Sequence, residues 1–390
     1  MLRDCNNRLR DIKFGGLYEI YGQALKLEEQ GKRIIHMEIG RPDFDSPEFA
    51  KEAAKRALDK GEVHYTEISG IEPLRHAIME REKERFGIEF DYRTEISVTA
   101  GAAESIAVIM LALMDPGDEI MATSPFFSAY AEQALIANVK LIEVPVTLKN
   151  NWQLKIEDLE QRITSKTRIL LINSPNNPTG YILNRENLQK IADIAIAHNL
   201  IVISDECYDD FVYEEEHISI STLPGMKERT FVVKSTSKSF SMTGWRIGYV
   251  IGPAHMMKYI NKVHQNFSTC ATSFAQWGAL EAFKHGAEFV TNMVKEFKRR
   301  GDFLFQAMSG IERIKMLKPA GAFYAFPDIS ELKMDEADFC TYLLNEAGVV
   351  GVPGPAFGTY GTGHIRLAYC RHYDEIVEAM EKMKIAVDKL

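Results

Sequence analysis

The sequence has 390 residues, which exceeds one ordinary core and predicts two or three structural units. Hydrophobic residues make up 46% and charged residues 26%, and this globular composition argues against a disordered or fibrous chain. The formal net charge of −9, with no basic tail, argues against non-specific nucleic-acid binding, which depends on neutralising phosphates.

The N-terminus and the cysteines indicate the cellular compartment in which the protein is expected. No apolar run approaches the ~18 residues of a membrane span, and charged residues stand where a signal peptide would carry its apolar stretch. The five cysteines are scattered and form no Cys-x-x-Cys pair, and the ten histidines lack metal-ligand spacing. We therefore expect a cytoplasmic protein with reduced thiols, no membrane span and no bound metal.

Strand and helix signals alternate through the middle of the chain. A helical pattern opens at Thr99 and stops at Asp115-Pro-Gly, and Asn184 can cap a second helix that ends near residues 198–199. Strands are predicted at residues 119–123, 168–173, 200–205 and 230–235. This βαβ order predicts an α/β domain with a mostly parallel sheet.

After about residue 280 the pattern changes. A long charged helix is predicted over 289–308, with short strands at 323–326 and 364–367. This part of the chain predicts a second, smaller α+β domain.

Polar segments follow three consecutive strands. They are Asn173-Ser-Pro-Asn-Asn-Pro-Thr-Gly, Ser204-Asp-Glu-Cys-Tyr, and the hydroxyl-rich run from Lys234 to Arg246. Ligands of open α/β sheets bind beyond the carboxyl ends of the strands, so these segments can bind a phosphorylated ligand beside a lysine amine. Each segment alone also fits an ordinary turn, a solvated loop or a local cap. Their occurrence together, in this order, favours a binding site.

Three motifs carry a resemblance to a known family. Asn177-Pro-Thr-Gly, Asp205-x-x-Tyr208 and Ser235-x-Ser-Lys238-x-Phe-x-x-x-Gly-Trp-Arg246 together resemble the class I/II aminotransferases, which are pyridoxal-phosphate enzymes of fold type I. The similarity covers nearly the whole chain. It includes Gly40-x-Pro-Asp-Phe, Tyr65-x-x-x-x-Gly70-x-x-x-Leu-Arg75, Gly101-Ala-Ala, Pro353-Gly-x-x-Phe-Gly358 and Arg366-Leu.

The resemblance implies a role for each residue around the cofactor ring. Lys238 is similar to the Schiff-base lysine that moves the proton during transfer, and its pKa should be depressed. Asp205 would keep the pyridine nitrogen protonated, while Asn177 and Tyr208 would bind the phenolic oxygen. Phe127 is similar to the aromatic residue that stacks on the ring, with Phe126 as its rival; either can equally be a core residue.

The resemblance also implies a phosphate site and a second subunit. The phosphate ligands are expected to be Gly101, Ala102 and Ala103 at a helix start, together with Ser235, Ser237 and Arg246. Tyr65 would reach the phosphate of a neighbouring subunit, so a homodimer with shared sites is implied. Arg366 would bind the substrate carboxylate, helped by Gly40 and Asn177.

The implied activity is a ping-pong transfer of an amino group between an L-amino acid and a 2-oxo acid, with glutamate/2-oxoglutarate or aspartate as one pair. A carbon–sulfur lyase is the alternative, because it uses the same lysine and differs only in losing a β-substituent. A non-catalytic regulator is disfavoured, since it needs a DNA-binding module for which there is no room before Gly40.

The side-chain preference is left open by the sequence. Bacterial aspartate-specific relatives place a lysine two residues after the first glycine of the 101 loop, where this chain has Ala103 followed by Glu104. Arg41 is a candidate replacement, although a surface role fits it equally. Aromatic, alanine-like and other neutral substrates therefore remain open alongside acidic ones.

The resemblance also sharpens the expected division into domains. A large cofactor-binding α/β domain should span residues 46–280. Residues 1–45 and 281–390 should form the smaller domain.

Overall fold

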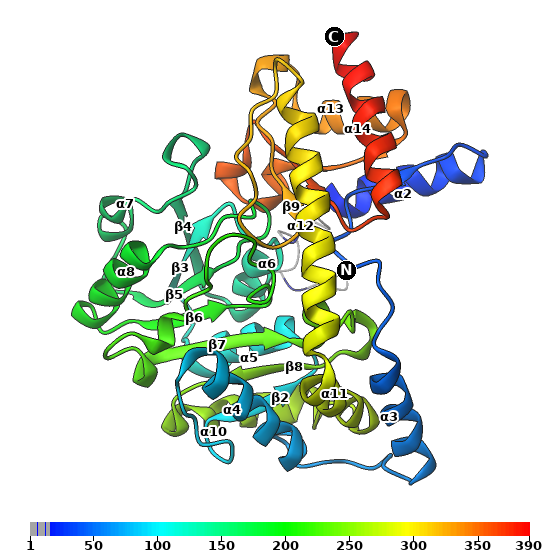
Figure 1. Cartoon of the computed structure of the whole chain (residues 1–390). Coiled ribbons are helices and arrows are strands. Elements are labelled where there is room, and N and C mark those ends of the chain that lie inside the picture. Colours follow the sequence, from blue (N-terminus) through cyan, green and yellow to red (C-terminus); the bar gives the residue numbers. More distant parts are fainter. Residues whose placement is uncertain (1–5, 7–11, 13–15) are drawn as a thin grey trace, which may run out of the picture.

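A seven-stranded sheet forms the centre of the larger part of the molecule (Figure 1). The computed structural model of the chain describes residues 6, 12 and 16–390. The strands run in the order β2-β8-β7-β6-β5-β3-β4, all parallel except β8, which is antiparallel to both neighbours. Their bounds are β2 Ile96–Thr99, β3 Glu119–Ser124, β4 Lys140–Pro145, β5 Thr167–Asn173, β6 Ile201–Asp205, β7 Thr230–Ser235 and β8 Gly248–Ile251.

Helices cover both faces of this sheet because its central strands are apolar on both sides. Ile169 and Ile203 pack in one hydrophobic cluster with α5 and α10, while Leu170 and Val202 pack on the other face with α8. The helices of this part are α3 Glu48–Asp59, α4 Glu72–Phe86, α5 Ala102–Leu113, α6 Ala129–Ala137, α7 Ile156–Glu160, α8 Arg185–Ala197, α9 Thr236–Ser239, α10 Ala254–Ser268 and α11 Ser273–His285.

The N-terminal and C-terminal segments of the described chain lie together in the upper part of Figure 1, where α2 is beside α14. Strand β1 (Ile35–His36) pairs in parallel with β10 (Val349–Val350), which joins the N-terminal segment to the C-terminal one. A second small sheet has the order β11-β12-β9, with bounds Val352–Pro353, Ile365–Ala368 and Tyr324–Ala325. The helices here are α2 Gly16–Glu29, α12 Ala287–Ser309, α13 Glu336–Ala347 and α14 Tyr373–Asp388, and α12 runs along both parts (Figure 1).

The expected elements are confirmed with small shifts at their ends. Strands β3, β5, β6 and β7 lie where the sequence predicts them, and α12 begins two residues earlier than expected. The strand expected over 323–326 is shorter, because only Tyr324 and Ala325 pair with β12. The helix expected to start near Thr99 begins at Ala102, since Gly101 precedes it with a φ of 103°.

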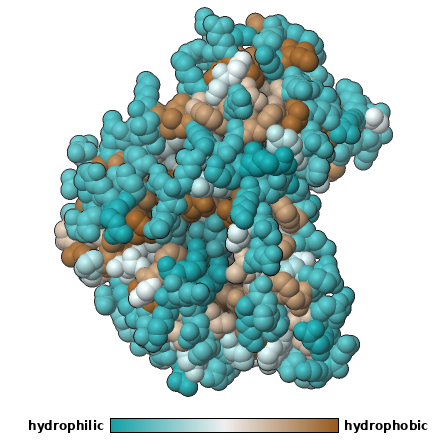
Figure 2. Space-filling view, viewed as in Figure 1, coloured by the Kyte–Doolittle hydropathy of each residue, from teal (hydrophilic) through white to brown (hydrophobic). Residues whose placement is uncertain are grey.

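The hydropathy of the outer surface is that expected of a folded chain whose apolar residues are mostly buried (Figure 2). The face seen in Figure 2 is mainly hydrophilic, with hydrophobic residues in separate small groups. Among the described helices, none is long and apolar enough to cross a bilayer. Cys207, Cys270, Cys340 and Cys370 are unpaired, whereas Cys5 and most of the segment before residue 16 lie outside the described residues.

Removal of the α8 cap should lower stability by a small, measurable amount. The Asn184 side chain accepts a hydrogen bond of 2.8 Å from the backbone N–H of Asn187. Asn184→Ala should lower the free energy of unfolding by about 1 kcal/mol in urea titrations, because this N–H loses its partner. Gln189→Ala, on the exposed face of the same helix, is the control and should change stability by less than about 0.5 kcal/mol. Equal effects of the two variants would contradict the assignment of the cap.

Candidate active site

A cavity of about 300 Å³ lies beside the last residues of β5, β6 and β7. Its size and its mixed apolar and polar wall suit a small ligand. The sequence-predicted residues in its wall are Gly40, Ala102, Ala103, Phe127, Asn177, Asp205, Tyr208, Ser235, Ser237, Lys238, Arg246 and Arg366. The loops that follow separate strands are therefore brought together at one edge of the sheet, as the topology requires.

Asp205 lies at the end of β6 and is 6% exposed. Its carboxylate accepts hydrogen bonds from the Tyr130 hydroxyl at 2.5 Å and from the backbone N–H of Cys207 at 3.1 Å. Burial raises the pKa of Asp205, whereas these two donors act in the opposite direction. A buried carboxylate is stabilised by an opposite charge, so Asp205 favours binding of a cationic group in the cavity.

Lys238 projects from α9 into the same cavity. Its Nζ donates to the backbone oxygen of Gly40 at 2.7 Å, and burial lowers its pKa. The lowered pKa agrees in direction with the sequence-based expectation and makes the neutral amine more accessible near pH 7. The hydroxyl groups of Tyr208 and Tyr324 lie 2.8 Å apart in the cavity wall.

The part of the cavity wall formed by α5 and Arg246 has features that suit an anion. The α5 helix begins there with Ala102, so free backbone N–H groups and the positive helix end face this region. Arg246 is held by the backbone oxygens of Thr243 and Ala100 at 3.0 and 3.1 Å. A Cβ on Gly101 would lie 2.3 Å from Arg246 Nη2, which explains the glycine and its positive φ.

Arg366 lies on β12 and reaches the cavity with 4% exposure. Its Nη1 donates to Asn177 Oδ1 at 3.0 Å, and its Nη2 donates to the backbone oxygen of Glu38. Its Nε is buried and has no hydrogen-bond partner among the described residues. An unpartnered N–H on a buried guanidinium fits a carboxylate ligand, which accepts two N–H groups at once.

Phe126, Tyr65 and Arg41 lie outside the cavity, unlike Phe127. Phe127 lines the cavity, whereas Phe126 is 2% exposed within the core formed with α5 and α6, which favours Phe127 as the stacking residue. Tyr65 is 84% exposed and lies outside the cavity of its own chain. Arg41 lines a separate hollow with Glu28 and His36 and is not among the residues that line this cavity.

Two tyrosines of the site were missed by the sequence analysis. Tyr130 stood next to the Phe126-Phe127 motif, but nothing local indicates that its hydroxyl reaches Asp205, 75 positions away. Tyr324 contacts both Tyr208 and the face of Arg366, whose Cζ lies 4.8 Å from the ring centroid. A Cβ on Gly40 would lie 1.9 Å from the Tyr324 hydroxyl, which explains why this loop needs glycine.

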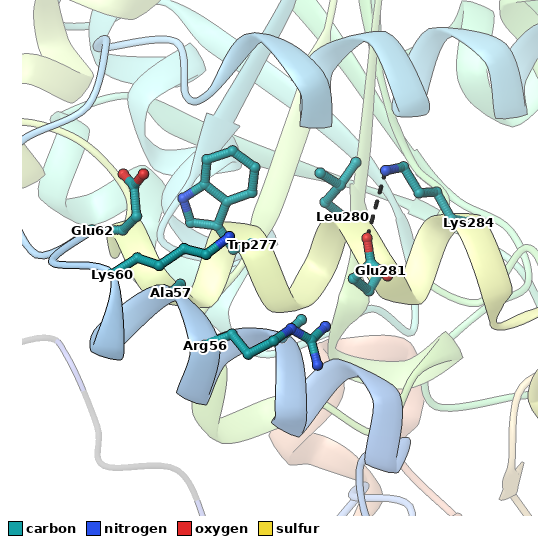
Figure 3. Close-up of a pocket in the computed structure, with 9 residues that line it drawn as sticks. Arg56, Ala57, Lys60, Glu62, Trp277, Leu280, Glu281 and Lys284 are labelled. Atoms are coloured by element: carbon teal, nitrogen blue, oxygen red, sulfur yellow. Dashed lines mark ion pairs between the residues drawn. The ribbon is translucent and has the colours of Figure 1, made fainter.

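Another hollow, of about 240 Å³, lies between α3 and α11 (Figure 3). Figure 3 shows Arg56 and Lys60 on one side and Trp277 on the other, with Lys284 paired to Glu281 at 3.5 Å. None of the strand-end residues predicted for chemistry lines this hollow. The cavity around Lys238 is therefore the candidate active site.

Comparisons with known proteins agree with this geometry. The family described as Aminotransferase class I and II matches residues 32–382. The chain is 39% identical to aromatic-amino-acid aminotransferase 2 of Thermococcus litoralis, covering 90% of this chain and 91% of the relative. It is 40% identical to an aspartate aminotransferase of Pyrococcus abyssi, again covering 90% and 91%. Its fold superposes on the aspartate aminotransferase from Thermus thermophilus with maleate with a TM-score of 0.94, at 34% identity and covering 99% and 100% of the two chains.

The chain belongs to the class I and II aminotransferases, has fold type I, and is a pyridoxal-phosphate-dependent aminotransferase of amino acids and 2-oxo acids. The named relatives do not favour a carbon–sulfur lyase. The cavity fits the cofactor: it has a buried carboxylate for a ring nitrogen, an amine for an aldehyde, and a cation at a helix start for a phosphate.

Proposed function

We propose that Lys238, Asp205 and Arg366 carry out the transfer in the roles expected from the sequence. Pyridoxal phosphate, when bound, supplies an aldehyde that takes up the amino group and a ring that withdraws electrons from the substrate. Lys238 would hold the aldehyde of the bound cofactor and would move the proton at the substrate Cα, for which its lowered pKa is suited. Asp205 would stabilise the proton on the ring nitrogen, and Asn177 and Tyr208 would donate to the phenolic oxygen.

The remaining cavity residues bind the two anionic groups. Ser235, Ser237, Arg246 and the α5 start at Gly101–Ala103 bind the phosphate, while Phe127 packs on the ring. Arg366 binds the substrate α-carboxylate, with Gly40 and Asn177 beside it. The observation that carries this proposal is that Asp205, Lys238 and Arg366, from three distant segments, line one cavity with the donors and acceptors that their roles require.

We also propose aspartate or glutamate as one amino donor and a ping-pong order. The names of the relatives support acidic and aromatic substrates. The described cavity wall contains three basic side chains, Lys238, Arg246 and Arg366, all of which have other proposed roles. A side-chain carboxylate therefore requires a cation from outside this wall, and a second subunit is the proposed source.

A homodimer with shared sites accounts for the position of Tyr65. The residue is 84% exposed, which suits a side chain that enters the phosphate site of a partner subunit. Light scattering should give twice the chain mass, and Tyr65→Phe should weaken cofactor binding without changing that mass. We also propose that residues 46–280 form the large domain and that 1–45 and 281–390 form the small one. The proposed location is the cytoplasm, with which the unpaired cysteines among the described residues agree.

The donor is identified by mixing the cofactor-loaded enzyme with each amino acid in turn, without a 2-oxo acid. Transfer predicts conversion of the bound cofactor to its amino form together with release of the matching 2-oxo acid. A lyase instead releases pyruvate and ammonia from a β-substituted donor and leaves the cofactor unchanged. Aspartate or glutamate should react fastest or nearly so; if neither reacts, the proposed donor is wrong.

Arg366→Ala should lower kcat/KM for every amino acid by about 10²–10³-fold, mainly through KM, because the common α-carboxylate loses its buried partner. Arg366→Lys is the control: it keeps the charge, loses the two-pronged N–H geometry, and should recover only part of the loss. Steady-state kinetics with an acidic and an aromatic donor provide the measurement. A defect limited to one donor would instead assign Arg366 to side-chain recognition.

A further inference from the structure

A buried ion cluster lies behind the active site, centred on Lys234. Lys234 is 2% exposed, and its Nζ lies 2.8 and 2.9 Å from the two carboxylate oxygens of Glu82 on α4. The same Nζ lies 3.0 Å from Asp209 Oδ2 and 3.5 Å from Glu206 Oε2. One ammonium group therefore holds three carboxylates that are all at most 5% exposed.

Three members of this cluster, Glu206, Asp209 and Lys234, are each adjacent in sequence to an active-site residue. Glu206 follows Asp205, Asp209 follows Tyr208, and Lys234 precedes Ser235. Successive side chains of an extended segment point to opposite sides, so Lys234 points toward α4 while Ser235 lines the cavity. The cluster therefore links the segments that carry the residues of the cofactor site, on the side that faces away from the cavity.

The charges around Lys234 make it the common partner of the cluster. Arg85 contacts Asp209 at 2.5 Å, and His217 lies 3.1 Å from Glu206. Glu82 has no other ion-pair partner among the described residues. Without Lys234, three buried carboxylates would face one another, which disfavours their present positions.

We propose that Lys234 is a positioning residue for the transfer reaction: its ion pairs with Glu82, Glu206 and Asp209 hold Asp205 and Tyr208 in place for the cofactor. The proposal rests on the role of Asp205 given above. Burial would lower the pKa of Lys234, but Asp209, Glu82 and Glu206 raise it, so the amine is charged at neutral pH. It is distinct from Lys238, which faces the cavity and pairs with no carboxylate of the described part of the chain.

The test compares Lys234→Met with Lys234→Arg and with the charge-balanced pair Lys234→Met/Glu82→Gln. In each protein, cofactor affinity of the apo chain, the pH midpoint of cofactor absorbance, kcat and thermal unfolding are measured. Lys234→Met should lower kcat by about 10²-fold. A shift of about 1 Å in a group that acts on the reacting atoms has an effect of this size, even when the substituted residue lies away from those atoms. Lys234→Met should also raise the pH midpoint of cofactor absorbance by about one pH unit. A proton that is held less firmly on the ring nitrogen repels a second proton on the cofactor less strongly, and the gain or loss of that second proton changes the absorbance.

Asp205 is also in contact with Tyr130, Cys207 and Asn173, and these groups stay unchanged in every variant. Lys234→Arg should recover most of kcat. The pair Lys234→Met/Glu82→Gln should recover thermal stability but not kcat, because Glu206 and Asp209 keep their contacts with His217 and Arg85 but still lack the ammonium group that joins them. This variant also serves if Lys234→Met alone fails to fold. In an Asp205→Asn background, Lys234→Met should leave the absorbance midpoint unchanged, as expected for a residue that acts through Asp205.

A loss of stability with normal kcat, cofactor affinity and absorbance midpoint would overturn the proposal and leave Lys234 a purely structural residue. Full kcat in the charge-balanced pair would overturn it as well. Failure of the role of Asp205 is seen separately, as normal kcat in Asp205→Asn alone. The two hypotheses are therefore decided by different variants.

Discussion

Lys238→Ala should lower turnover to about 10⁻²–10⁻⁴ of the normal rate or less. It should also remove the absorbance band of the covalently held cofactor. The rate factor is that expected for loss of a positioned proton-transfer group, and loss of the covalent attachment adds to it. The residue is well placed for both tasks, since its Nζ lies in the cavity, donates to Gly40 and has a pKa lowered by burial.

Lys238→Arg is the matched control for charge. Arginine keeps a cation at this position but cannot release its proton near pH 7, so it should be as inactive as alanine. Absorbance spectra and rates with one amino acid donor measure both outcomes. An intact absorbance band in Lys238→Ala would show that another amine holds the cofactor and would contradict the assignment.

Asp205→Ala should leave much of the cofactor bound while lowering kcat by about 10²–10³-fold. The proposed phosphate site is untouched by the change, so binding should persist, but the ring nitrogen would lose the buried carboxylate that is proposed to stabilise its proton. Equilibrium dialysis measures cofactor retention, and the rate follows from the same samples.

The control for Asp205 is Tyr130→Phe, which removes the 2.5 Å hydrogen bond but keeps the carboxylate. Burial raises the pKa of Asp205 and the Tyr130 donor opposes this shift. Loss of the donor should therefore move the fall in activity on acidification to higher pH, with a smaller effect at neutral pH than Asp205→Ala. Near-normal kcat in Asp205→Ala would refute its role at the ring nitrogen.

The strand-end residues could be predicted because their signals are local. An apolar strand followed by a polar loop marks the carboxyl end of a parallel strand, and the βαβ order brings Asn173, Asp205 and Ser235 to one edge. The helix cap at Asn184 could be predicted for the same reason. Arg366, 128 positions beyond Lys238, could be assigned only through the family resemblance.

Contacts between distant segments could not be predicted from the sequence. Tyr130, Tyr324 and Glu82 have no local motif, and their roles depend on how α6, the small sheet and α4 pack against the large sheet. The sequence likewise left Phe126 and Phe127 open, since these adjacent residues in the loop after β3 differ only in which way they point. Packing separates them: one is in the core and the other lines the cavity.

The central claim is that this cavity transfers an amino group from donor to cofactor and then to an acceptor. It is tested most directly by a single-turnover experiment, in which the cofactor-loaded enzyme meets excess aspartate or glutamate with no 2-oxo acid present. The account predicts one equivalent of 2-oxo acid per bound cofactor, no ammonia, and full recovery of the original absorbance when 2-oxoglutarate or oxaloacetate is added. Continuous release of ammonia, or 2-oxo acid well beyond one equivalent, would contradict it.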